Sequence, residues 1–364
     1  MTKFRVPLAH PKPDIERFMQ VVIQRHETDR PPLVEYIVDG ILYRPIVENL
    51  MGRKWADYLP DDRKAQEAYW DNYVAFWHCM GYDFVRLEMG LPFPSGSRIA
   101  EDSAEAAKGR MRGWAETGKG PIQSREDYEK YPWPKIEDEH FWPYEHISRR
   151  LPEGMGMFSC HGGGIFEHVS RLFGYETLCL MLYDDPGLVR DVTDRVGELL
   201  LAYHRRLCRI PGVVAIFQGD DMGFRSGPLI GADHMKEYFL SWHKRFAASA
   251  HESGRKYFLH SCGNLEQIME AIISDVGIDA KHSYEDAIVP VAEFKKRYGS
   301  RIGILGGIDV DVLARRSPEE VRAHVRKTIE ECNPGGGWAV GSGNSIPSYI
   351  PLENYLTMLD ESLA

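Results

Sequence analysis

Residues 255–264 read RKYFLHSCGN, and the fold prediction starts from this stretch. The apolar run 257–259 has the composition of a short buried strand. His260 and Cys262 are two residues apart, so on a strand they point to the same side. The following residues, LEQIMEAIISDVG, have helical spacing. The pattern predicts an imidazole and a thiol that converge where a strand gives way to a helix, an edge at which parallel α/β folds bind ligands. The alternative is a His and a Cys that only fill space.

The size and charge of the chain exclude several classes of protein. Its 364 residues suffice for one large α/β domain. The formal net charge is -10 and no basic cluster occurs, which argues against a nucleic-acid partner. No apolar run reaches the ~18 residues of a membrane span, and the first residues, MTKFRVPLAHPKPD, lack the apolar core of a signal peptide. We therefore expect a cytoplasmic protein with no membrane partner, whose six scattered cysteines are reduced thiols.

Segments with strand composition alternate with segments of helical periodicity along the chain. After a helical N-terminal cap over residues 1–30, we expect eight strands, each followed by a helix. They end near Asp39, Glu88, residues 161–164, Asp221, Cys262, Glu285, Asp309 and Asn344. Eight such units without the alternating pattern of an antiparallel sheet predict a (β/α)₈ TIM barrel, an α/β fold, as a single domain over residues 1–364.

A long insertion interrupts this alternation after the second expected strand. Residues 91–150 are rich in Pro, Gly, Trp and charge, and residues 100–116, AEDSAEAAKGRMRGWAE, read as a helix. Sixty residues are too many for a plain connection, so we interpret the insertion as a lid whose aromatic residues cover an apolar ligand. The alternative is a surface excursion that packs its own small core.

Polar residues gather at the expected carboxyl ends of the strands, where barrel enzymes build their sites. Two mechanisms fit them. In the first, His260 and Cys262 hold a zinc ion with a third protein ligand. In the second, acids and bases act without metal. The catalytic candidates are His260, Asp220, Asp221, Glu167 and Asp309, and the substrate-binding candidates are Glu35, Glu88, His282 and Asn344. For the adjacent aspartates, the alternative is that one caps the turn at Gly223 while the other is solvated.

Four segments carry a resemblance to a known family: GDDMGFRSGPLI (219–230), FLHSCGN (258–264), LGGID (305–309) and IPLENYLTML (350–359). From about residue 30 onward the chain resembles the uroporphyrinogen decarboxylase superfamily. These are (β/α)₈ barrels, and the superfamily also contains zinc- and cobamide-dependent methyltransferases. The decarboxylase itself carries an arginine motif of the form RQAGRY, where this chain reads PPLVEYIVDGILYRPI (31–46). A tetrapyrrole with eight carboxylates needs clustered cations, and a mouth lined with Glu35, Asp39, Glu88 and two aspartates would repel it.

The methyltransferase branch is similar at the opening stretch. Its zinc motif is His-x-Cys followed by a Cys near the C-terminus, and His260 and Cys262 match the first two ligands. Asn344 stands where those enzymes carry the second Cys, so either a carboxylate such as Glu167 or Asp309 completes the site or zinc is bound weakly or is missing.

The resemblance implies a methyltransferase that moves a methyl group from a small methylated substrate to the Co(I) ion of a corrinoid on a separate carrier protein. The donor is an aryl methyl ether, as in O-demethylase systems, or alternatively a quaternary amine. A metal-free decarboxylase of a small acid and a catalytically silent corrinoid-binding barrel are the competing interpretations.

Overall fold

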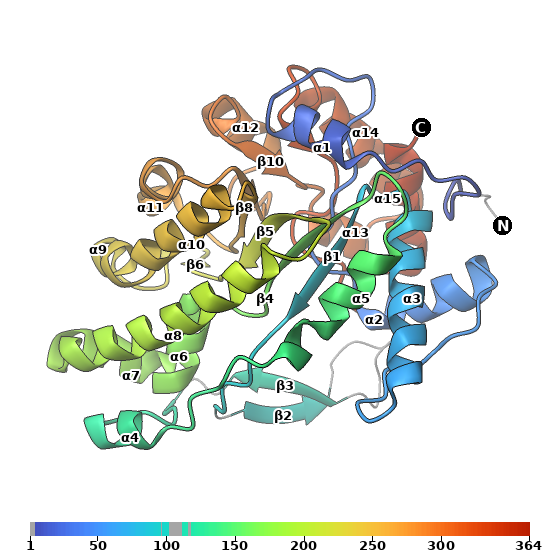
Figure 1. Ribbon diagram of the computed structural model, residues 1–364. Coiled ribbons are helices and arrows are strands. Elements are labelled where there is room, and N and C mark those ends of the chain that lie inside the picture. Colours follow the sequence, from blue (N-terminus) through green and yellow to red (C-terminus); the bar gives the residue numbers. More distant parts are fainter. Residues whose placement is uncertain (1–3, 96, 102–110, 116–117) are drawn as a thin grey trace.

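A curled sheet of seven parallel strands forms the centre of the protein (Figure 1). The computed structural model describes residues 4–95, 97–101, 111–115 and 118–364. The strands lie in the order β1-β4-β5-β8-β9-β10-β11. Their bounds are β1 (Phe84–Met89), β4 (Gly156–His161), β5 (Val213–Gly219), β8 (Lys256–His260), β9 (Ala280–His282), β10 (Gly303–Leu305) and β11 (Trp338–Ala339). The last seven of the eight expected strands are therefore confirmed.

Helices cover the outside of the sheet, as the strand-helix alternation predicts (Figure 1). The long helix that the sequence places after Asp185-Pro186 is present as α8, and Asp185 Oδ1 accepts a hydrogen bond from the Leu188 amide at 2.9 Å. No helix in the described ranges is both long enough and apolar enough to cross a membrane. The main helices are α1 (Ile15–Val22), α2 (Gly40–Pro45), α3 (Arg63–Cys79), α6 (Ile165–Phe173), α7 (Tyr175–Asp184), α8 (Pro186–Leu207), α10 (Ser241–Glu252), α11 (Glu266–Ala271), α12 (Val291–Tyr298), α13 (Val310–Arg315), α14 (Pro318–Cys332) and α15 (Leu352–Ser362).

The first expected strand lies beside β11 but makes only isolated bridges. Leu33 pairs with Val340 and Val38 pairs with Ile346, both in parallel orientation. The Val34 amide donates to the Val340 carbonyl at 2.8 Å, and the Ile346 amide donates to the Ile37 carbonyl at 2.7 Å. The segment therefore occupies the place of an eighth strand next to the last one. A barrel closed by eight continuous strands stays a prediction.

The insertion contains strands where the sequence predicted a helix. β2 (Ser97–Glu101) and β3 (Met111–Ala115) form an antiparallel pair. The expected helix over residues 100–116 is therefore wrong at both ends, while residues 102–110 and 116 lie outside the described residues. At residues 100–101 and 111–115, cross-strand pairing outweighs helical propensity. Helices follow at α4 (Arg125–Lys130) and α5 (Trp142–Arg150). Whether the insertion acts as a lid stays a prediction.

The sheet encloses an aromatic layer below a polar one. Phe158 packs against Phe217 and Phe258, with ring centroids 6.3 and 5.2 Å apart. At the amino ends of the strands, Phe18 of α1 packs edge-on against Phe84 and Phe158, at 5.6 and 5.3 Å. Since side chains alternate along a strand, the next inward positions on β8 and β9 lie above this layer, toward the carboxyl ends. The apolar interior therefore supports a polar layer at the face where the site lies.

Candidate functional site

Three side chains converge at the carboxyl ends of β5 and β8: those of Asp221, His260 and Cys262. Each offers one ligand atom, and these atoms lie within 4.8 Å of one another. His260 Nε2 lies 3.5 Å from Cys262 Sγ and 3.6 Å from Asp221 Oδ1. The Cys262 amide donates to Asp221 Oδ1 at 3.0 Å, which ties the loop after β8 to the loop after β5. The predicted convergence of His260 and Cys262 on one point is confirmed, and we call the three residues the Asp221 cluster.

A second histidine fixes the ring of His260. The register pairs His260 on β8 with His282 on β9, and their Nδ1 atoms are 2.7 Å apart. His282 Nε2 lies 3.0 Å from the Ser342 carbonyl oxygen, which only accepts, so Nε2 of His282 carries the proton. Burial lowers the pKa of His282 to about 3 and also lowers the pKa of His260, so both rings are neutral. His260 Nδ1 therefore donates to His282 Nδ1, and the lone pair of His260 Nε2 faces Cys262 and Asp221.

Tyr36 holds the other side of the His260 ring. The two rings stack with centroids 3.9 Å apart and planes 7° from parallel. The Tyr36 hydroxyl donates to Glu88 Oε2 at 3.0 Å. A Cβ atom on Gly219 would lie 2.1 Å from the Tyr36 oxygen, so only glycine leaves room for the ring at this point of β5. The stack therefore depends on a residue from the segment beside β11 and on a glycine from β5.

Asn344 contacts the thiol of Cys262. Its Nδ2 donates to Cys262 Sγ at 3.2 Å, and the Ser283 hydroxyl lies 4.0 Å from the same sulfur. Burial, followed by the nearby Asp221 carboxylate, raises the pKa of the Cys262 thiol well above its usual value. Without a cation the sulfur is therefore a thiol, and a cation at the cluster would favour the thiolate.

The donor set of the Asp221 cluster fits zinc. An imidazole nitrogen, a thiolate sulfur and a carboxylate oxygen are the three kinds of ligand that zinc takes in proteins. In a tetrahedral site with bonds of about 2.0 to 2.3 Å, neighbouring ligand atoms are about 3.3 to 3.7 Å apart, and both distances from His260 Nε2 fall in this range. Three protein ligands would leave one position for a substrate atom, the pattern of catalytic zinc sites.

The other catalytic candidates make hydrogen bonds within the protein and lie outside the Asp221 cluster, so their catalytic roles stay predictions. Asp220 is fully buried and accepts from the Phe166 and Glu167 amides, both at 3.0 Å, and from His243 at 2.8 Å. Glu167 accepts from the Gly164 amide and from Arg171, and burial, together with Asp220, raises its pKa.

Asp309 is the N-cap of α13. It accepts from the Asp311, Val312 and Asp286 amides. Neither Glu167 nor Asp309 is the carboxylate that joins His260 and Cys262, because Asp221 holds that place. Of the alternative for the aspartate pair, the cap does not hold for Asp220, which binds the start of α6, whereas the Asp221 side chain is 47% exposed and thus partly solvated.

All four substrate-binding candidates have partners within the protein. Glu35 is fully buried and accepts from the Ser342 hydroxyl at 2.5 Å and the Ser342 amide at 3.2 Å, so it does not line the mouth. His282 is also fully buried, with both ring nitrogens bonded. Asn344 contacts the Cys262 sulfur. Glu88 accepts from Arg86 at 2.8 Å, and its side chain is 29% exposed. Of the two carboxylates in this set, those of Glu35 and Glu88, only the Glu88 carboxylate reaches solvent.

Sequence reasoning missed a buried guanidinium beneath the site. Arg86 on β1 lies 4.5 Å from the Tyr36 ring centroid, and its Nη2 donates to Glu88, to Cys160 and to the Phe217 carbonyl. Nε and Nη1 of Arg86 have no hydrogen-bond partner among the described residues. The signal in the sequence is a single Arg inside the apolar strand FVRLEM. Arg86 therefore supports both Tyr36 and Glu88 from below.

A hollow of about 750 Å³ adjoins the cluster through Asn344. Its walls come from the loops after β9 and β11 and from α13 with its N-cap Asp309, and they include Glu285, Tyr349 and Arg315. The volume is in the range of small-molecule sites. The hollow is predominantly acidic, with one arginine at its edge.

Comparisons with known proteins agree on one family. Residues 118–362, about two thirds of the chain, match the family model described as uroporphyrinogen decarboxylase (URO-D). The uroporphyrinogen decarboxylase of Thioalkalivibrio sulfidiphilus is 28% identical over 205 residues, which are 55% of this chain and 53% of that protein. The uroporphyrinogen decarboxylase of Actinobacillus succinogenes is 27% identical over 187 residues, 50% of this chain and 49% of that protein. The chain thus spans about half the length of these curated relatives.

A solved structure matches the whole fold. The methyltransferase from Methanosarcina mazei superposes with a TM-score of 0.69 at 16% sequence identity, covering 96% of this chain and 98% of that chain. At this identity the likeness shows a common fold, which includes the curled parallel sheet described above.

Proposed function

Because the chain belongs to the uroporphyrinogen decarboxylase (URO-D) family, we propose that it is a methyltransferase of a corrinoid-dependent system. It moves a methyl group from a small methylated donor to the Co(I) ion of a corrinoid that a carrier protein supplies. The observation that carries the proposal is the Asp221 cluster, whose His260 Nε2 lone pair faces a thiol and a carboxylate at zinc-ligand spacing. The proposed setting is the cytoplasm.

Asp221, His260 and Cys262 would hold the zinc ion. When bound there, zinc supplies a Lewis acid that stabilises negative charge on the heteroatom losing its methyl group. The chain's own residues prepare this position. His282 and Tyr36 keep the His260 ring in one orientation, and Asn344 donates a hydrogen bond to the Cys262 sulfur. As the bond from methyl carbon to heteroatom breaks, the heteroatom keeps the electron pair.

Two donor classes fit the neighbourhood of the cluster. An aryl methyl ether leaves a phenolate, whose charge needs a Lewis acid. A quaternary ammonium donor is favoured by the acidic walls of the 750 Å³ hollow, which also contain the aromatic ring of Tyr349. We place the aryl ether first because a neutral leaving amine has less need of the zinc ion.

Elemental analysis of the purified protein tests the metal site. We expect about one zinc per chain in the parent protein and little in Cys262→Ser, since the hydroxyl is a poor zinc ligand. Cys79→Ser, on α3 and away from the cluster, is the matched control and should keep its zinc. Equal metal content in all three proteins, or none, would contradict the zinc site.

A methyl-transfer assay tests the reaction. The protein is mixed with a Co(I) corrinoid carrier and a panel of methyl aryl ethers and quaternary amines, and the corrinoid absorbance is followed. We expect methylation of the corrinoid with one class of donor and its loss in Cys262→Ser. No spectral change with any donor would refute the proposal.

Decarboxylation is the second candidate, because the curated relatives carry that name. Of the five carboxylates that the sequence places at the mouth, Glu35 and Asp220 are in fact fully buried, so repulsion of an acidic substrate is weaker than expected. Release of carbon dioxide from uroporphyrinogen by the purified protein, unchanged in Cys262→Ser, would support this candidate against the methyltransferase.

A further inference from the structure

A buried lysine lies beside the Asp221 cluster with no carboxylate in direct contact among the described residues. Lys281 on β9 is 3% exposed, and its Nζ donates to the Ser283 carbonyl at 2.6 Å. An ammonium has three N–H donors, so two remain. Among the described residues, no carboxylate lies within 4.0 Å of this nitrogen, since Lys281 makes none of the ion pairs. The amine lies 4.6 Å from the Tyr284 ring centroid and 5.4 Å from that of Phe294, and Glu285 and Asp221 act on it from beyond 4.0 Å. Since lysines are almost never fully buried without a charged partner in contact, an anion could still bind here.

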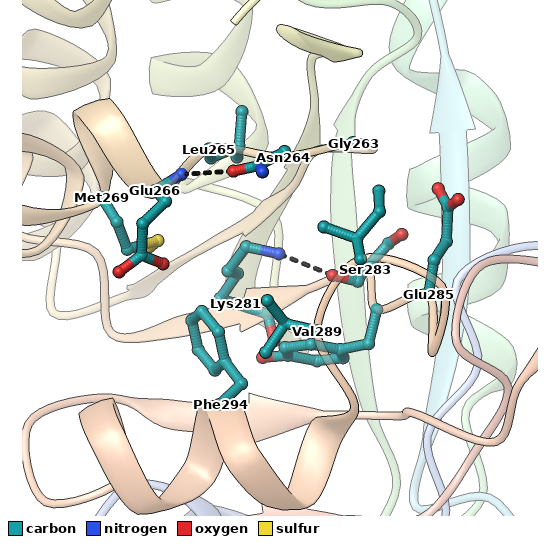
Figure 2. A pocket seen from close by; sticks show the side chains of 12 residues that line it. Gly263, Asn264, Leu265, Glu266, Met269, Lys281, Ser283, Glu285, Val289 and Phe294 are labelled. Atoms are coloured by element: carbon teal, nitrogen blue, oxygen red, sulfur yellow. Dashed lines mark hydrogen bonds between the residues drawn. The ribbon is translucent and has the colours of Figure 1, made fainter. Parts of the chain in front are cut away.

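The amine lines a small pocket between the loops after β8 and β9. Figure 2 shows Lys281 and Asn264 on its walls, together with the apolar side chains of Leu265, Val289 and Phe294. The Asn264 Oδ1 accepts from the Glu266 amide at 3.0 Å, which leaves its Nδ2 group without a partner among the described residues. Two sets of unused N–H donors, one of them charged, therefore line one pocket.

The dimensions of the pocket select the chemical class of its ligand. The space inside is about 30 Å³, enough for a carboxylate group and too small for an aromatic ring. Burial lowers the pKa of Lys281 to about 8, so at neutral pH most of the amine carries its charge. Glu285 also lines the pocket, but its carboxylate points away from the amine in Figure 2.

Ser283 joins this pocket to the cluster. Its carbonyl accepts from Lys281, and its hydroxyl lies 4.0 Å from Cys262 Sγ. Glu285 in turn lines both this pocket and the 750 Å³ hollow. A molecule whose body lies in the hollow, beside the cluster, can therefore extend one short polar group toward Lys281.

We propose that Lys281 Nζ and Asn264 Nδ2 form a subsite for the carboxylate of a small organic acid, which is the methyl donor. This inference rests on the proposed function for the identity of the acid. It applies to either donor class, because both a methoxylated aromatic acid and a betaine carry a carboxylate beside the methylated atom. The subsite would select methyl donors that carry a carboxylate, which the Asp221 cluster alone does not do.

Calorimetric titration of the purified protein with benzoate, and with benzamide as its neutral counterpart, tests the subsite without any methyl transfer. We expect the parent protein to bind benzoate more tightly than benzamide. Lys281→Met keeps the length of the side chain and removes the charge. A hydrogen bond to a charged group contributes about 1.5 to 3 kcal/mol, so benzoate affinity should fall about tenfold to a hundredfold in this variant.

Asn264→Asp is the second variant, in case the first fails to fold. It keeps the oxygen that accepts from the Glu266 amide and replaces the Nδ2 donor by a negative oxygen, so it should weaken benzoate in the same way. The control is Lys256→Met on the neighbouring strand, whose amine pairs with Asp279 outside the pocket at 2.9 Å. Its benzoate affinity should equal that of the parent protein.

Equal benzoate affinity in the parent protein and in both pocket variants would overturn the subsite, as would equal binding of benzoate and benzamide. Failure of the proposed function looks different. In that case benzoate binding depends on Lys281, while no donor, with or without a carboxylate, methylates the corrinoid.

Discussion

At the scale of single residues, groups outside the Asp221 cluster set the orientation and the tautomer of His260. The Ser342 carbonyl fixes the proton of His282, and His282 then fixes the proton of His260. Such outer partners of a ligating histidine set its tautomer and its orientation. The tautomer that His260 presents to the cluster therefore depends on Ser342, which follows β11, three strands along the sheet from β8.

Substitution of His282 tests this relay. His282→Leu removes the acceptor for His260 Nδ1–H, and we expect zinc affinity to fall about tenfold to a hundredfold, as for other outer partners of metal ligands. His282→Gln can accept from His260 through its oxygen and donate to Ser342 through its nitrogen, so its loss should be much smaller. Competition with a chromophoric chelator measures both affinities. Equal affinities in the two variants would show that the relay does not matter.

The sequence predicted the pair at 260 and 262 because a period of two on one strand is a local property. It also placed Asp221 at the same edge. The choice of Asp221 over Glu167 and Asp309 depends on which loops meet after β5 and β8, which is a property of the folded sheet. Arg86 and Lys281 each appear in the sequence as one charge inside an apolar strand, and only the fold shows what surrounds them.

At the scale of elements, the Asp220 carboxylate joins β5 to the two helices α6 and α10. Asp220, at the end of β5, accepts from the first amides of α6 and from His243 of α10. It is fully buried, so its removal leaves these donors without partners and without water.

We expect Asp220→Ala to lower the free energy of unfolding by about 3 kcal/mol or more, since each unsatisfied buried donor costs about 1 to 3 kcal/mol. Asp62→Ala is the matched control. Asp62 is an exposed N-cap of α3 that also accepts two amides, and its removal should cost about 0.5 to 2 kcal/mol. Urea denaturation measures both. A smaller loss for Asp220 than for Asp62 would contradict the anchoring role.

Seven strands and most helices follow from patterns that are local. The position of segment 33–38 does not follow from local patterns, because its backbone hydrogen bonds to Val340 and Ile346 depend on how the sheet curls. The helix expected at 100–116 shows the opposite error, since local helical propensity gave way to pairing between β2 and β3.

Glu35 ties the segment 33–38 to the end of β11 and makes the stability depend on pH. Burial raises its pKa from 4.5 to about 8, although hydrogen bonds from Ser342 oppose the shift. Below pH 4.5 the group is protonated in both the folded and the unfolded chain, so its contribution is fully present. Between pH 4.5 and 8 only the unfolded chain releases the proton, so the group's contribution falls by about 1.4 kcal/mol per pH unit.

We expect Glu35→Gln to remove this contribution. The difference in unfolding free energy between variant and parent should then rise with pH from about 4.5 to about 8. Urea titrations at half-unit pH steps measure the difference. The exposed Glu353→Gln on α15 is the control and should track the parent protein. A flat difference curve for Glu35→Gln would show that Glu35 ionises in the folded protein.

At the scale of the whole molecule, the aromatic contacts of α1 and the Asp221 cluster lie at opposite ends of the sheet. Phe18 of α1 is fully buried and packs on Phe84 and Phe158 at the amino ends of the strands. The Asp221 cluster lies at the carboxyl ends, above the aromatic layer. In barrels built from parallel strands, the amino face contributes stability and the carboxyl face carries the chemistry.

Phe18→Ala tests this separation. Loss of a buried Phe costs about 3 to 5 kcal/mol through lost burial and the cavity that remains, so the urea midpoint should drop markedly. The protein that stays folded should bind the same amount of zinc with the same affinity as the parent, because α1 packs at the amino ends of the strands and the cluster lies at their carboxyl ends. Cys262→Ser should show the reverse, with lost zinc and a nearly unchanged midpoint when both proteins are compared without metal. If Phe18→Ala also lost its zinc under folding conditions, the two ends of the sheet would be coupled, and the site would depend on the closure of the interior by α1.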